Sequence, residues 1–375
     1  MTIIGLLGIC MALGAGFFFD KKVQSRSPSN ATSNADPYIE LSMQEEDFYL
    51  VGNVVKEWMK GEKSATDLYN QYREAGRVYT SESVKIKYSI YNIWNSIKVV
   101  DQTAYLSTDD QFEHSTVFSM GAEERSLRLD YLYVDTTYYF KLIVLLSNGE
   151  ELSITSSFKT AASPRIITIE PLRNIRDIGG WVTTDGKVIK QGLLYRGSEL
   201  DGATEPKYQL DESGIQIMLE KLGIKTELDL RASNLPGVQD VLGESVKHNY
   251  YSFLSYSECF TESGRRKLKN IFSDLANPDN YPIYLHCAYG ADRTGTVCYF
   301  LEAILGLSEE DLYREWELSI LQNGGAFFEE MDSFVETMKT FEGSTMKEKA
   351  ENYLLSIGVT QQEIDSIREI FLGSD

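Results

Sequence analysis

The chain has 375 residues, of which 42% are hydrophobic, and its formal net charge is −20. A chain of this length and apolar content can form two domains, each with a core of its own. The acidic balance, without a basic stripe, argues against nucleic acid or an anionic membrane surface as a partner. The three His residues are dispersed and no Cys-x-x-Cys pair occurs, so we expect neither a metal site nor a cofactor.

The N-terminus is an apolar run over residues 3–19, followed by a Ser- and Asn-rich stretch. We interpret 1–19 as a hydrophobic targeting segment or membrane anchor and 20–36 as a linker. Export is favoured, so we expect an extracytoplasmic protein that is secreted or held on a membrane through residues 3–19. Lys21 and Lys22 follow the run. By charge bias alone, they would keep the downstream part of the chain in the cytoplasm, which is the opposite orientation. Lipidation at Cys10 is an alternative fate of the segment.

Residues 37–163 form the first predicted domain. Apolar side chains over 53–75 have helical spacing with a break near Gly61, which predicts a short helical insertion. From residue 83 the pattern alternates between apolar and polar side chains, with polar turns between short runs. The runs lie at 84–90, 103–106 and 116–118. This spacing is typical of a β-sandwich.

The last part of this region, over 132–160, is the most specific. Its long alternating run is followed by Asn148-Gly149, a strong hairpin signal, and by a final run. Tyr138 has the position of a Tyr that opens the penultimate strand and bonds back to the preceding corner. The segment therefore resembles the end of a fibronectin type III domain, and such modules commonly lie outside cells. An irregular β extension of the following domain is the alternative.

Residues 164–375 form the second predicted domain, and its decisive feature is one ten-residue run. The run is His286-Cys287-Ala288-Tyr289-Gly290-Ala291-Asp292-Arg293-Thr294-Gly295. A buried strand at 281–285 precedes it and a helix follows it to Gly306, so the run is a turn at a helix N-terminus. Such a turn binds phosphate through backbone N–H groups. We assign phosphate binding to Ala288, Tyr289, Gly290, Ala291, Thr294 and Gly295.

Three side chains of the run carry the expected chemistry. The helix dipole and the Arg293 charge favour a Cys287 thiolate, which can attack phosphorus. Arg293 can bind two phosphoryl oxygens, a geometry that Lys cannot copy. Asp292 is the nearest carboxyl that can protonate the leaving group and later activate water. A buried structural thiol is the alternative for Cys287, and a helix cap is the alternative for Asp292.

Three further residues are expected to support the site. We expect His286 to donate or accept hydrogen bonds around the loop rather than to act as a base. Asp229 and Arg231 end an alternating run, which places them near strand ends where α/β sites form. A structural ion pair between them is an equally good interpretation. Cys298 lies on an apolar helix and is expected in the core, whereas Cys259 has no predicted place.

The loop resembles that of the cysteine-dependent protein tyrosine phosphatases, and further segments are similar to the bacterial tyrosine/serine phosphatase branch. These segments lie at 174–180, 194–198, 228–231 and 353–364. The resemblance covers about residues 165–372 and implies a central, mostly parallel sheet flanked by helices. It also implies the general-acid role of Asp292. Ala291 stands where this branch often has a Lys associated with phosphoinositides, which turns the expected substrate away from lipids.

The expected protein is therefore an α/β phosphatase preceded by a small β-sandwich. The expected reaction is two-step hydrolysis of phosphate monoesters, most of all protein phosphotyrosine, with phosphoserine or phosphothreonine as further substrates. The expected partner is a phosphorylated protein or peptide. Two alternatives stay open: an inositol-phosphate or phosphoinositide phosphatase, and a non-catalytic surface protein that captures phosphate and mediates adhesion.

Overall fold

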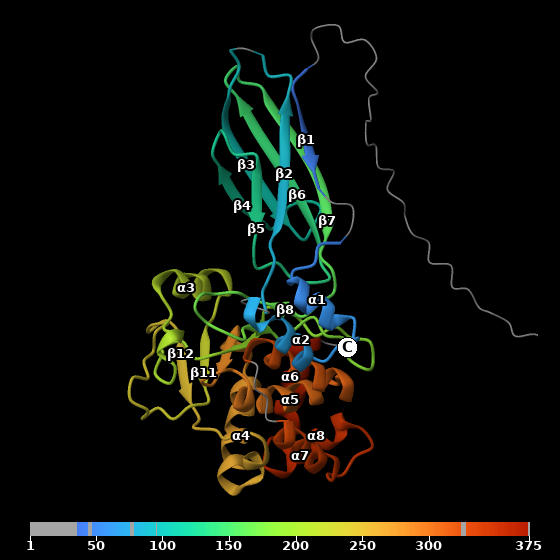
Figure 1. The fold of residues 1–375 in the computed structure, drawn as a ribbon, viewed down its shortest axis with the longest axis vertical. Helices are drawn as coiled ribbons and strands as arrows, with labels where there is room; N and C mark the ends of the chain where they lie inside the picture. The colour runs from blue at the N-terminus through green and yellow to red at the C-terminus, as the bar shows by residue number, and fades with distance from the viewer. Residues whose placement is uncertain (1–35, 44–46, 76–78, 95, 324–327, 374–375) are drawn as a thin grey trace, which may run out of the picture.

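The structure is a computed structural model that describes residues 36–43, 47–75, 79–94, 96–323 and 328–373. The segment 1–19, including Cys10, and nearly all of the linker 20–36 lie outside these residues. Within the described part, no helix has the length and hydropathy needed to cross a bilayer. Figure 1 shows an elongated arrangement with a β-strand part at one end and a larger α/β part at the other.

The first part contains two antiparallel sheets, with the strand orders β1-β2-β5 and β4-β3-β6-β7. The strands are β1 (Tyr38–Ser42), β2 (Val84–Tyr91), β3 (Val99–Ser107), β4 (Ser115–Met120), β5 (Ser126–Leu129), β6 (Thr137–Leu146) and β7 (Glu151–Lys159). Alternate side chains point inward, as Phe140, Leu142 and Val144 do on β6. Buried side chains from both sheets form one hydrophobic cluster, so the two sheets enclose a common core.

The corner before β6 has the hydrogen bond that the sequence predicts. The Tyr138 hydroxyl accepts from the Tyr133 N–H at 2.8 Å, and the Thr160 hydroxyl donates to the Tyr133 carbonyl at 2.7 Å. The expected hairpin joins β6 to β7, where Gly149 takes a φ of +85°. Only glycine adopts this φ without strain, which explains the Asn-Gly pair at this turn.

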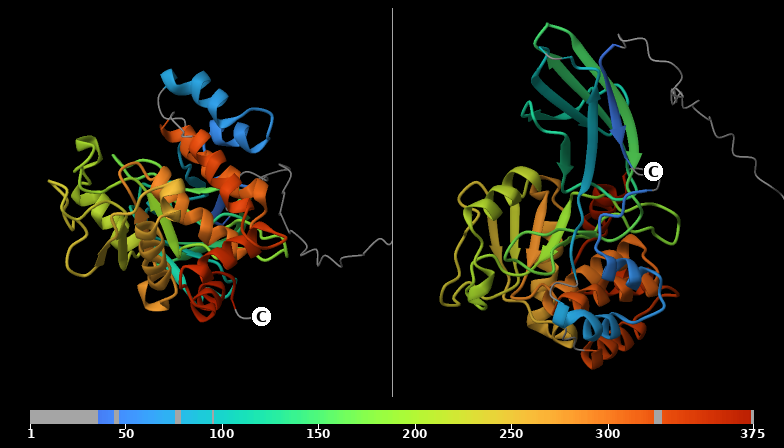
Figure 2. Two further views of the ribbon diagram at one scale, coloured as in Figure 1. Left: turned by 90° about the horizontal axis from the view of Figure 1, so that it is seen from below. Right: turned by 45° about the horizontal axis from the view of Figure 1, so that its top comes forward.

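The helical insertion packs on the α/β part. Helices α1 (Asn53–Met59) and α2 (Ala65–Tyr72) bury their apolar faces in the same cluster as the C-terminal helices. The Trp58 indole N–H donates to Glu317 at 3.0 Å, and the other oxygen of this carboxylate accepts from the Ala65 N–H at 3.0 Å. Figure 2 shows these helices beside α6. The predicted first domain thus contributes to two cores: its strands enclose one, and its helical insertion joins the core of the α/β part.

The α/β part is built on a six-stranded sheet of order β12-β11-β13-β10-β9-β8. The strands are β8 (Arg165–Ile166), β9 (Arg176–Asp177), β10 (Leu194–Gly197), β11 (Thr226–Asp229), β12 (Lys247–Tyr250) and β13 (Ile283–His286). Strands β12, β11, β13 and β10 are parallel, whereas β9 and β8 pair antiparallel at one edge. This arrangement agrees with the mixed, mainly parallel sheet that the resemblance implies.

Helices cover both faces of this sheet. Leu194, Leu228 and Leu285 point into the cluster with the long helices, whereas Tyr195 and Tyr284 point into a separate cluster on the other face. The helices and helical turns are η2 (Pro206–Tyr208), α3 (Glu212–Gln216), η3 (Ile217–Lys221), η4 (Tyr256–Phe260), α4 (Glu262–Leu275), η5 (Pro278–Asn280), α5 (Asp292–Leu305), α6 (Glu309–Asn323), α7 (Phe328–Lys339), α8 (Met346–Ser356) and α9 (Gln361–Leu372).

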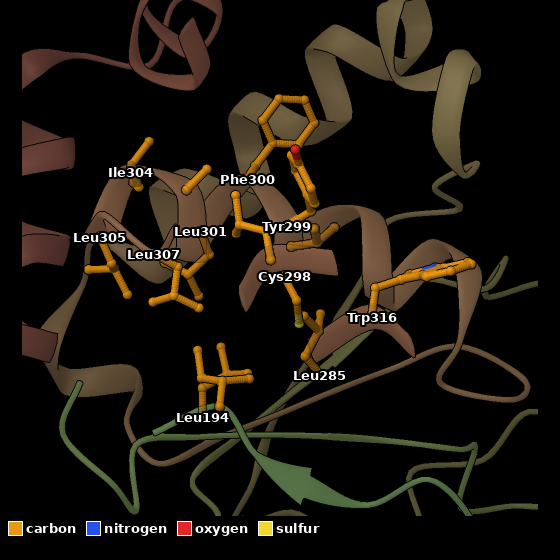
Figure 3. Packing of buried hydrophobic residues seen from close by; sticks show 14 of the residues in the cluster. Leu194, Leu285, Cys298, Tyr299, Phe300, Leu301, Ile304, Leu305, Leu307 and Trp316 are labelled. Carbon is orange, nitrogen blue, oxygen red and sulfur yellow. The ribbon is translucent and has the colours of Figure 1, made fainter. Parts of the chain in front are cut away.

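Helix α5 lies at the centre of this core. Its C-terminus is Gly306 in the left-handed conformation, with a φ of +101°, as expected for a helix that stops at glycine. Figure 3 shows Cys298 of α5 among apolar side chains with Leu285 of β13 nearby, and Cys298 is fully buried. Cys259 is also fully buried, in η4. These two thiols therefore serve packing rather than chemistry.

The two parts are joined through Arg165. Its buried guanidinium donates to the carbonyls of Leu132 and Tyr131, at 3.0 and 2.7 Å, and pairs with Asp177 at 2.6 Å. The guanidinium also lies over the Tyr133 ring, 4.3 Å from its centroid. Asp177 belongs to a segment whose role the sequence leaves open. Its role in the structure is to hold Arg165 at the junction of the two parts.

Candidate active site

The phosphate-binding loop lies where the sequence analysis expects it, between β13 and α5. Cys287 directly follows β13 and is 3% exposed, and α5 begins at Asp292. Gly290 has a φ of +66°, and a Cβ there would lie 2.3 Å from the Gly197 carbonyl oxygen. Glycine is therefore required at this position, because the loop crosses closely over the end of β10.

Arg196 supports this loop from inside the protein. One amino group of the fully buried guanidinium donates to the carbonyls of Gly290 and Ala291, at 2.8 and 3.2 Å. The other pairs with Glu315 of α6 at 2.6 Å. In a trans peptide the N–H points away from the C=O. Arg196 therefore directs the next N–H groups, those of Ala291 and Asp292, toward the opposite side, where an anion can bind.

A second buried arginine, Arg176, supports the loop at Tyr289 through Asn174. The Asn174 side-chain amide donates to the Tyr289 carbonyl at 3.2 Å, and Arg176 donates to the Asn174 side-chain oxygen at 2.5 Å. Arg176 also pairs with Glu315 at 2.5 Å. Burial alone would raise the pKa of Glu315, but Arg176 and Arg196 lower it below its ordinary value. The sequence analysis compared the segment over 174–180 with the family, but the sequence does not indicate these contacts.

We expect Arg196→Met to disable the loop. Removing one partner of a buried ion pair leaves Glu315 partly uncompensated, at a cost of about 3–5 kcal/mol in the free energy of unfolding. The loop carbonyls lose their donor, and a misplaced loop should lower kcat by about 100-fold. Urea unfolding and turnover at a temperature where the variant is folded measure both effects.

The matched control is Arg368→Met. The ion pair of Arg368 with Glu351 is partly exposed and distant in sequence from the loop. It should cost about 1 kcal/mol or less and leave kcat unchanged. A folded Arg196→Met protein with normal kcat would contradict the supporting role of Arg196.

Asp292 lies in the first turn of α5 and is held by a residue that the sequence analysis did not find. Its Oδ1 accepts from the Tyr256 hydroxyl at 2.8 Å, and this hydroxyl accepts from the Trp316 indole N–H at 3.1 Å. The N-cap position is Ala291, so Asp292 is not the capping residue. Burial raises the pKa of Asp292, against the opposing effects of Tyr256 and Arg293. A raised pKa favours the protonated carboxyl that a general acid needs.

The remaining loop side chains lie at the start of the same helix. Arg293 is half-buried in the first turn of α5. The Thr294 hydroxyl is buried, and no group of the described residues forms a hydrogen bond with it. A Cβ at Gly295 would lie 3.1 Å from the Trp316 ring and 3.3 Å from the Arg196 guanidinium, so a small residue lets both approach the helix start.

Residues 167–373 match the family model described as tyrosine phosphatase family, which covers more than half of the chain. The chain belongs to the tyrosine phosphatase family. It is thus a phosphatase with a cysteine-containing loop, as the resemblance implied.

Two solved structures show weaker similarity. The core catalytic domain of PP-IP phosphatase SIW14 from S. cerevisiae, in complex with citrate, aligns at 18% identity over 50% of this chain and 98% of that chain, with a TM-score of 0.32. An α-L-rhamnosidase from Dictyoglumus thermophilum aligns at 11% identity over 31% of this chain and 14% of that chain, with a TM-score of 0.20. Neither similarity bears on the substrate. No curated protein matches the chain.

His286 of this phosphatase is fully buried and contacts a carboxylate. Its Nε2 lies 2.8 Å from Glu227, whose other oxygen lies 3.1 Å from His248, and its Nδ1 lies 3.2 Å from the Cys287 carbonyl. Burial alone would lower the pKa of His286, but Asp229 and Glu227 raise it to about 9. A raised pKa favours the protonated ring, which would place a positive charge next to Cys287, in keeping with a supporting role.

Asp229 and Arg231 form the ion pair that was one of their two interpretations. The buried Arg231 guanidinium bonds Asp229 at 2.7 Å and Asp201 at 2.8 Å, and it also pairs with Glu199. The Glu199 carboxylate in turn accepts from the Thr204 N–H at 3.0 Å. This ion cluster of Arg231, Asp229, Asp201 and Glu199 therefore holds the segment over 199–205 against the end of β11.

Within the described residues, one group has a spacing suited to a metal ion, namely Glu227, Asp229 and His286, whose ligand atoms lie within 4.8 Å of one another. These ligand atoms already have partners, because Arg231 bonds Asp229 and His286 lies 2.8 Å from Glu227. This group therefore fits an ion-pair cluster better than a metal site.

The rim of the loop is aromatic and acidic. Tyr289, 38% exposed, donates its hydroxyl to the Glu205 carboxylate, and its ring packs edge-to-face with Tyr208 at 6.2 Å. Glu205 is the last residue of the segment over 199–205 that Arg231 holds. The segment over 199–208 thus places an aromatic wall and a carboxylate beside the phosphate-binding loop.

Proposed function

We propose that this phosphatase hydrolyses phosphate monoesters through a phosphocysteine formed on Cys287. The observation that carries the proposal is the placement of Cys287 at the end of β13, directly before a loop whose carbonyls bind Arg196. The loop N–H groups then take the phosphoryl oxygens, together with the forked guanidinium of Arg293. Asp292 lies in the first turn of the helix, with its pKa raised.

The reaction has two steps. The Cys287 thiolate attacks phosphorus, the bond from phosphorus to the ester oxygen breaks, and Asp292 gives its proton to that oxygen. In the second step the Asp292 carboxylate takes a proton from water, the water oxygen attacks phosphorus and the phosphorus–sulfur bond breaks. Inorganic phosphate leaves and the thiolate is restored. The buried Thr294 hydroxyl can donate to the departing sulfur.

The proposed substrate is phosphotyrosine in a protein or peptide. The aromatic ring of Tyr289 at the rim can pack against a phosphotyrosine ring. Glu205 bonds this rim residue, and a carboxylate there disfavours polyanions such as inositol polyphosphates. Ala291 stands where the branch often has Lys, and the net charge is −20. Both features also disfavour inositol polyphosphates as substrates.

A substrate panel tests this proposal. We expect kcat/KM for a phosphotyrosine peptide to exceed that for the matching phosphoserine peptide and for an inositol polyphosphate by at least about tenfold, a difference of about 1.4 kcal/mol. Glu205→Gln should narrow the gap to the inositol polyphosphate, because it removes a negative charge at the rim. Faster turnover of the inositol polyphosphate by the unaltered protein would support the inositol-phosphate alternative instead.

The pH dependence of turnover tests the role of Tyr256. As a general acid, Asp292 must be protonated, so kcat should fall as the pH rises through its folded pKa. The Tyr256 hydroxyl stabilises the carboxylate. Tyr256→Phe should therefore raise the pKa of Asp292 further and move the alkaline limb of the kcat profile to higher pH. If the variant folds normally by circular dichroism and the alkaline limb of its kcat profile is unchanged, the Tyr256 hydroxyl does not control the pKa of the general acid.

We also infer that residues 37–163 include a fibronectin type III-like domain of an exported bacterial protein. The strand orders of the two sheets and the Tyr138–Tyr133 hydrogen bond support this assignment. The apolar run over 3–19 supports export. Protease digestion of intact cells tests the location, because an exported protein should be cleaved without lysis.

A further inference from the structure

Exposed apolar side chains gather at one end of the β-strand part. We call this end the tip and define it by Tyr38, Tyr91, Trp94, Val100 and Leu145, which are between 38% and 56% exposed. They come from the start of β1, the end of β2, the turn after it, the start of β3 and the end of β6. The antiparallel pairing brings these strand ends together. Figure 1 shows this end farthest from the α/β part.

The tip holds more of the exposed large apolar side chains than other parts of the described molecule. Single exposed apolar residues are normal, whereas a gathered set at one place indicates a contact surface. Five of the fourteen large apolar side chains exposed among the described residues belong to the tip. Nothing in the fold requires them there, because the core of this part is already closed by other side chains.

Two of the three aromatic rings of the tip pack against each other, and the backbone of the third residue lies in a hydrogen-bonded turn. Tyr38 and Tyr91 are direct partners across β1 and β2, and their rings stack with centroids 5.1 Å apart. Trp94 lies in a turn closed by hydrogen bonds from the Ser96 and Ile97 N–H groups to its carbonyl, at 2.6 and 2.8 Å. The stacked pair therefore loses little entropy when it is buried in a partner.

We propose that the tip inserts its aromatic side chains into the interface of a zwitterionic lipid bilayer. Trp and Tyr are the residues that gather at membrane interfaces, where the ring is apolar and its polar edge stays hydrated. The tip thus acts as a second membrane contact beside the apolar run over 3–19. This contact keeps the α/β part, at the other end of the molecule, away from the lipid.

The position of the apolar run favours a bilayer over other partners. The run ends at Phe19, and Tyr38 of the tip follows 19 residues later. The number of residues between them limits how far the tip can lie from the end of the run. If the run lies in a bilayer, the tip is kept close to the same surface, at a high effective concentration. No other end of the described molecule has this short a connection to the run.

The charges around the tip decide the kind of lipid. Lys98 is exposed beside the tip, but Asp101, Glu150 and Glu151 are exposed at the same strand ends. This acidic excess gives no attraction to anionic lipids. Burial of aromatic rings, rather than charge, must supply the binding free energy, and a neutral phosphatidylcholine surface is the best match.

The test uses the full chain and phosphatidylcholine vesicles with a quencher on the headgroup. Trp58 and Trp316 are buried and Trp181 is half-buried, so Trp94 is the most exposed of the tryptophans in the structure. We expect the vesicles to quench the tryptophan emission, and Trp94→Phe to remove at least half of that quenching. This readout reports the tip even when the apolar run alone holds the chain on the vesicle.

Matched variants test whether the tip contributes affinity. Tyr91→Ser combined with Trp94→Ser should lower the vesicle partition coefficient by at least about tenfold, since two apolar rings are lost. The control is Val182→Ser combined with Val188→Ser, which removes two equally exposed apolar side chains from the α/β part and should leave partition unchanged. Turnover of a soluble aryl phosphate should be the same in all variants, which separates this test from that of the phosphatase activity.

Two outcomes would overturn the proposal. If the chain sediments with vesicles while Trp94 stays as accessible to aqueous iodide as in free protein, the apolar run binds alone and the tip does not insert. If the unaltered protein dimerises without vesicles and the Tyr91→Ser, Trp94→Ser variant does not, the tip binds a second copy of the chain instead.

Discussion

Cys287→Ser is expected to abolish phosphate release from a phosphotyrosine peptide, with a loss of at least about 10⁴-fold in kcat, while the peptide still binds. A serine hydroxyl at this position keeps the volume but cannot supply a thiolate. The loop N–H groups and Arg293 are unchanged, so the phosphate keeps its binding site. Stopped-flow phosphate release and calorimetric titration of the peptide measure the two quantities separately.

Cys298→Ala is the matched control for this variant. Cys298 is fully buried on α5, eleven residues after Cys287, and packs in the core that Figure 3 shows. The change should lower the free energy of unfolding by about 1–2 kcal/mol through a small cavity and leave kcat within a few-fold of normal. Undiminished phosphate release by Cys287→Ser would show that another group is the nucleophile, or that the reaction is not the proposed one.

Asp292→Asn is expected to slow the reaction according to the leaving group. For an alkyl phosphate, whose leaving oxygen must be protonated, kcat should fall by about 10²–10⁴-fold. For an aryl phosphate with a strongly acidic leaving phenol, the loss in the first step should be below about tenfold, because little proton donation is needed. A burst experiment that follows phenol release isolates this first step.

Glu205→Gln is the control for the identity of the acid. Glu205 is the carboxylate bonded to the loop residue Tyr289, and burial does not hold it protonated, because Tyr289 and Lys207 lower its pKa. Its amide variant should leave the dependence on the leaving group unchanged. If this variant and not Asp292→Asn abolished that dependence, the acid would be on the rim and not in the loop.

Much of the catalytic part follows from local sequence. The strand, turn and helix around Cys287, the glycine at the end of α5 and the strands of the first part lie close to their predicted positions. Each depends on side chains within one or two turns of chain: apolar periodicity, a glycine with positive φ, or a capping position. The family match over 167–373 confirms the tyrosine phosphatase family that the loop and its companion segments implied.

The support of the loop was decided by tertiary structure. Arg196 and Glu315 are 119 residues apart in the chain, and Tyr256 reaches Asp292 across 36 residues. Local pattern carries no signal for such pairs, because which buried charges meet depends on how the sheet and α6 pack. The same holds for Asp229 and Arg231: the sequence leaves two interpretations open, and the contacts of Arg231 with Asp201 and Glu199 make the pair part of a buried ion cluster.

The sequence alone determined the nucleophile candidate and its loop, because ten consecutive residues contain the chemistry. Tertiary structure decided what holds that loop, which core the insertion of α1 and α2 joins, and where the exposed aromatic rings gather. The physical reason is the range of the interactions. Turns and helix ends form among neighbours in the chain, whereas buried ion pairs, shared cores and surface patches exist only after distant segments have packed together.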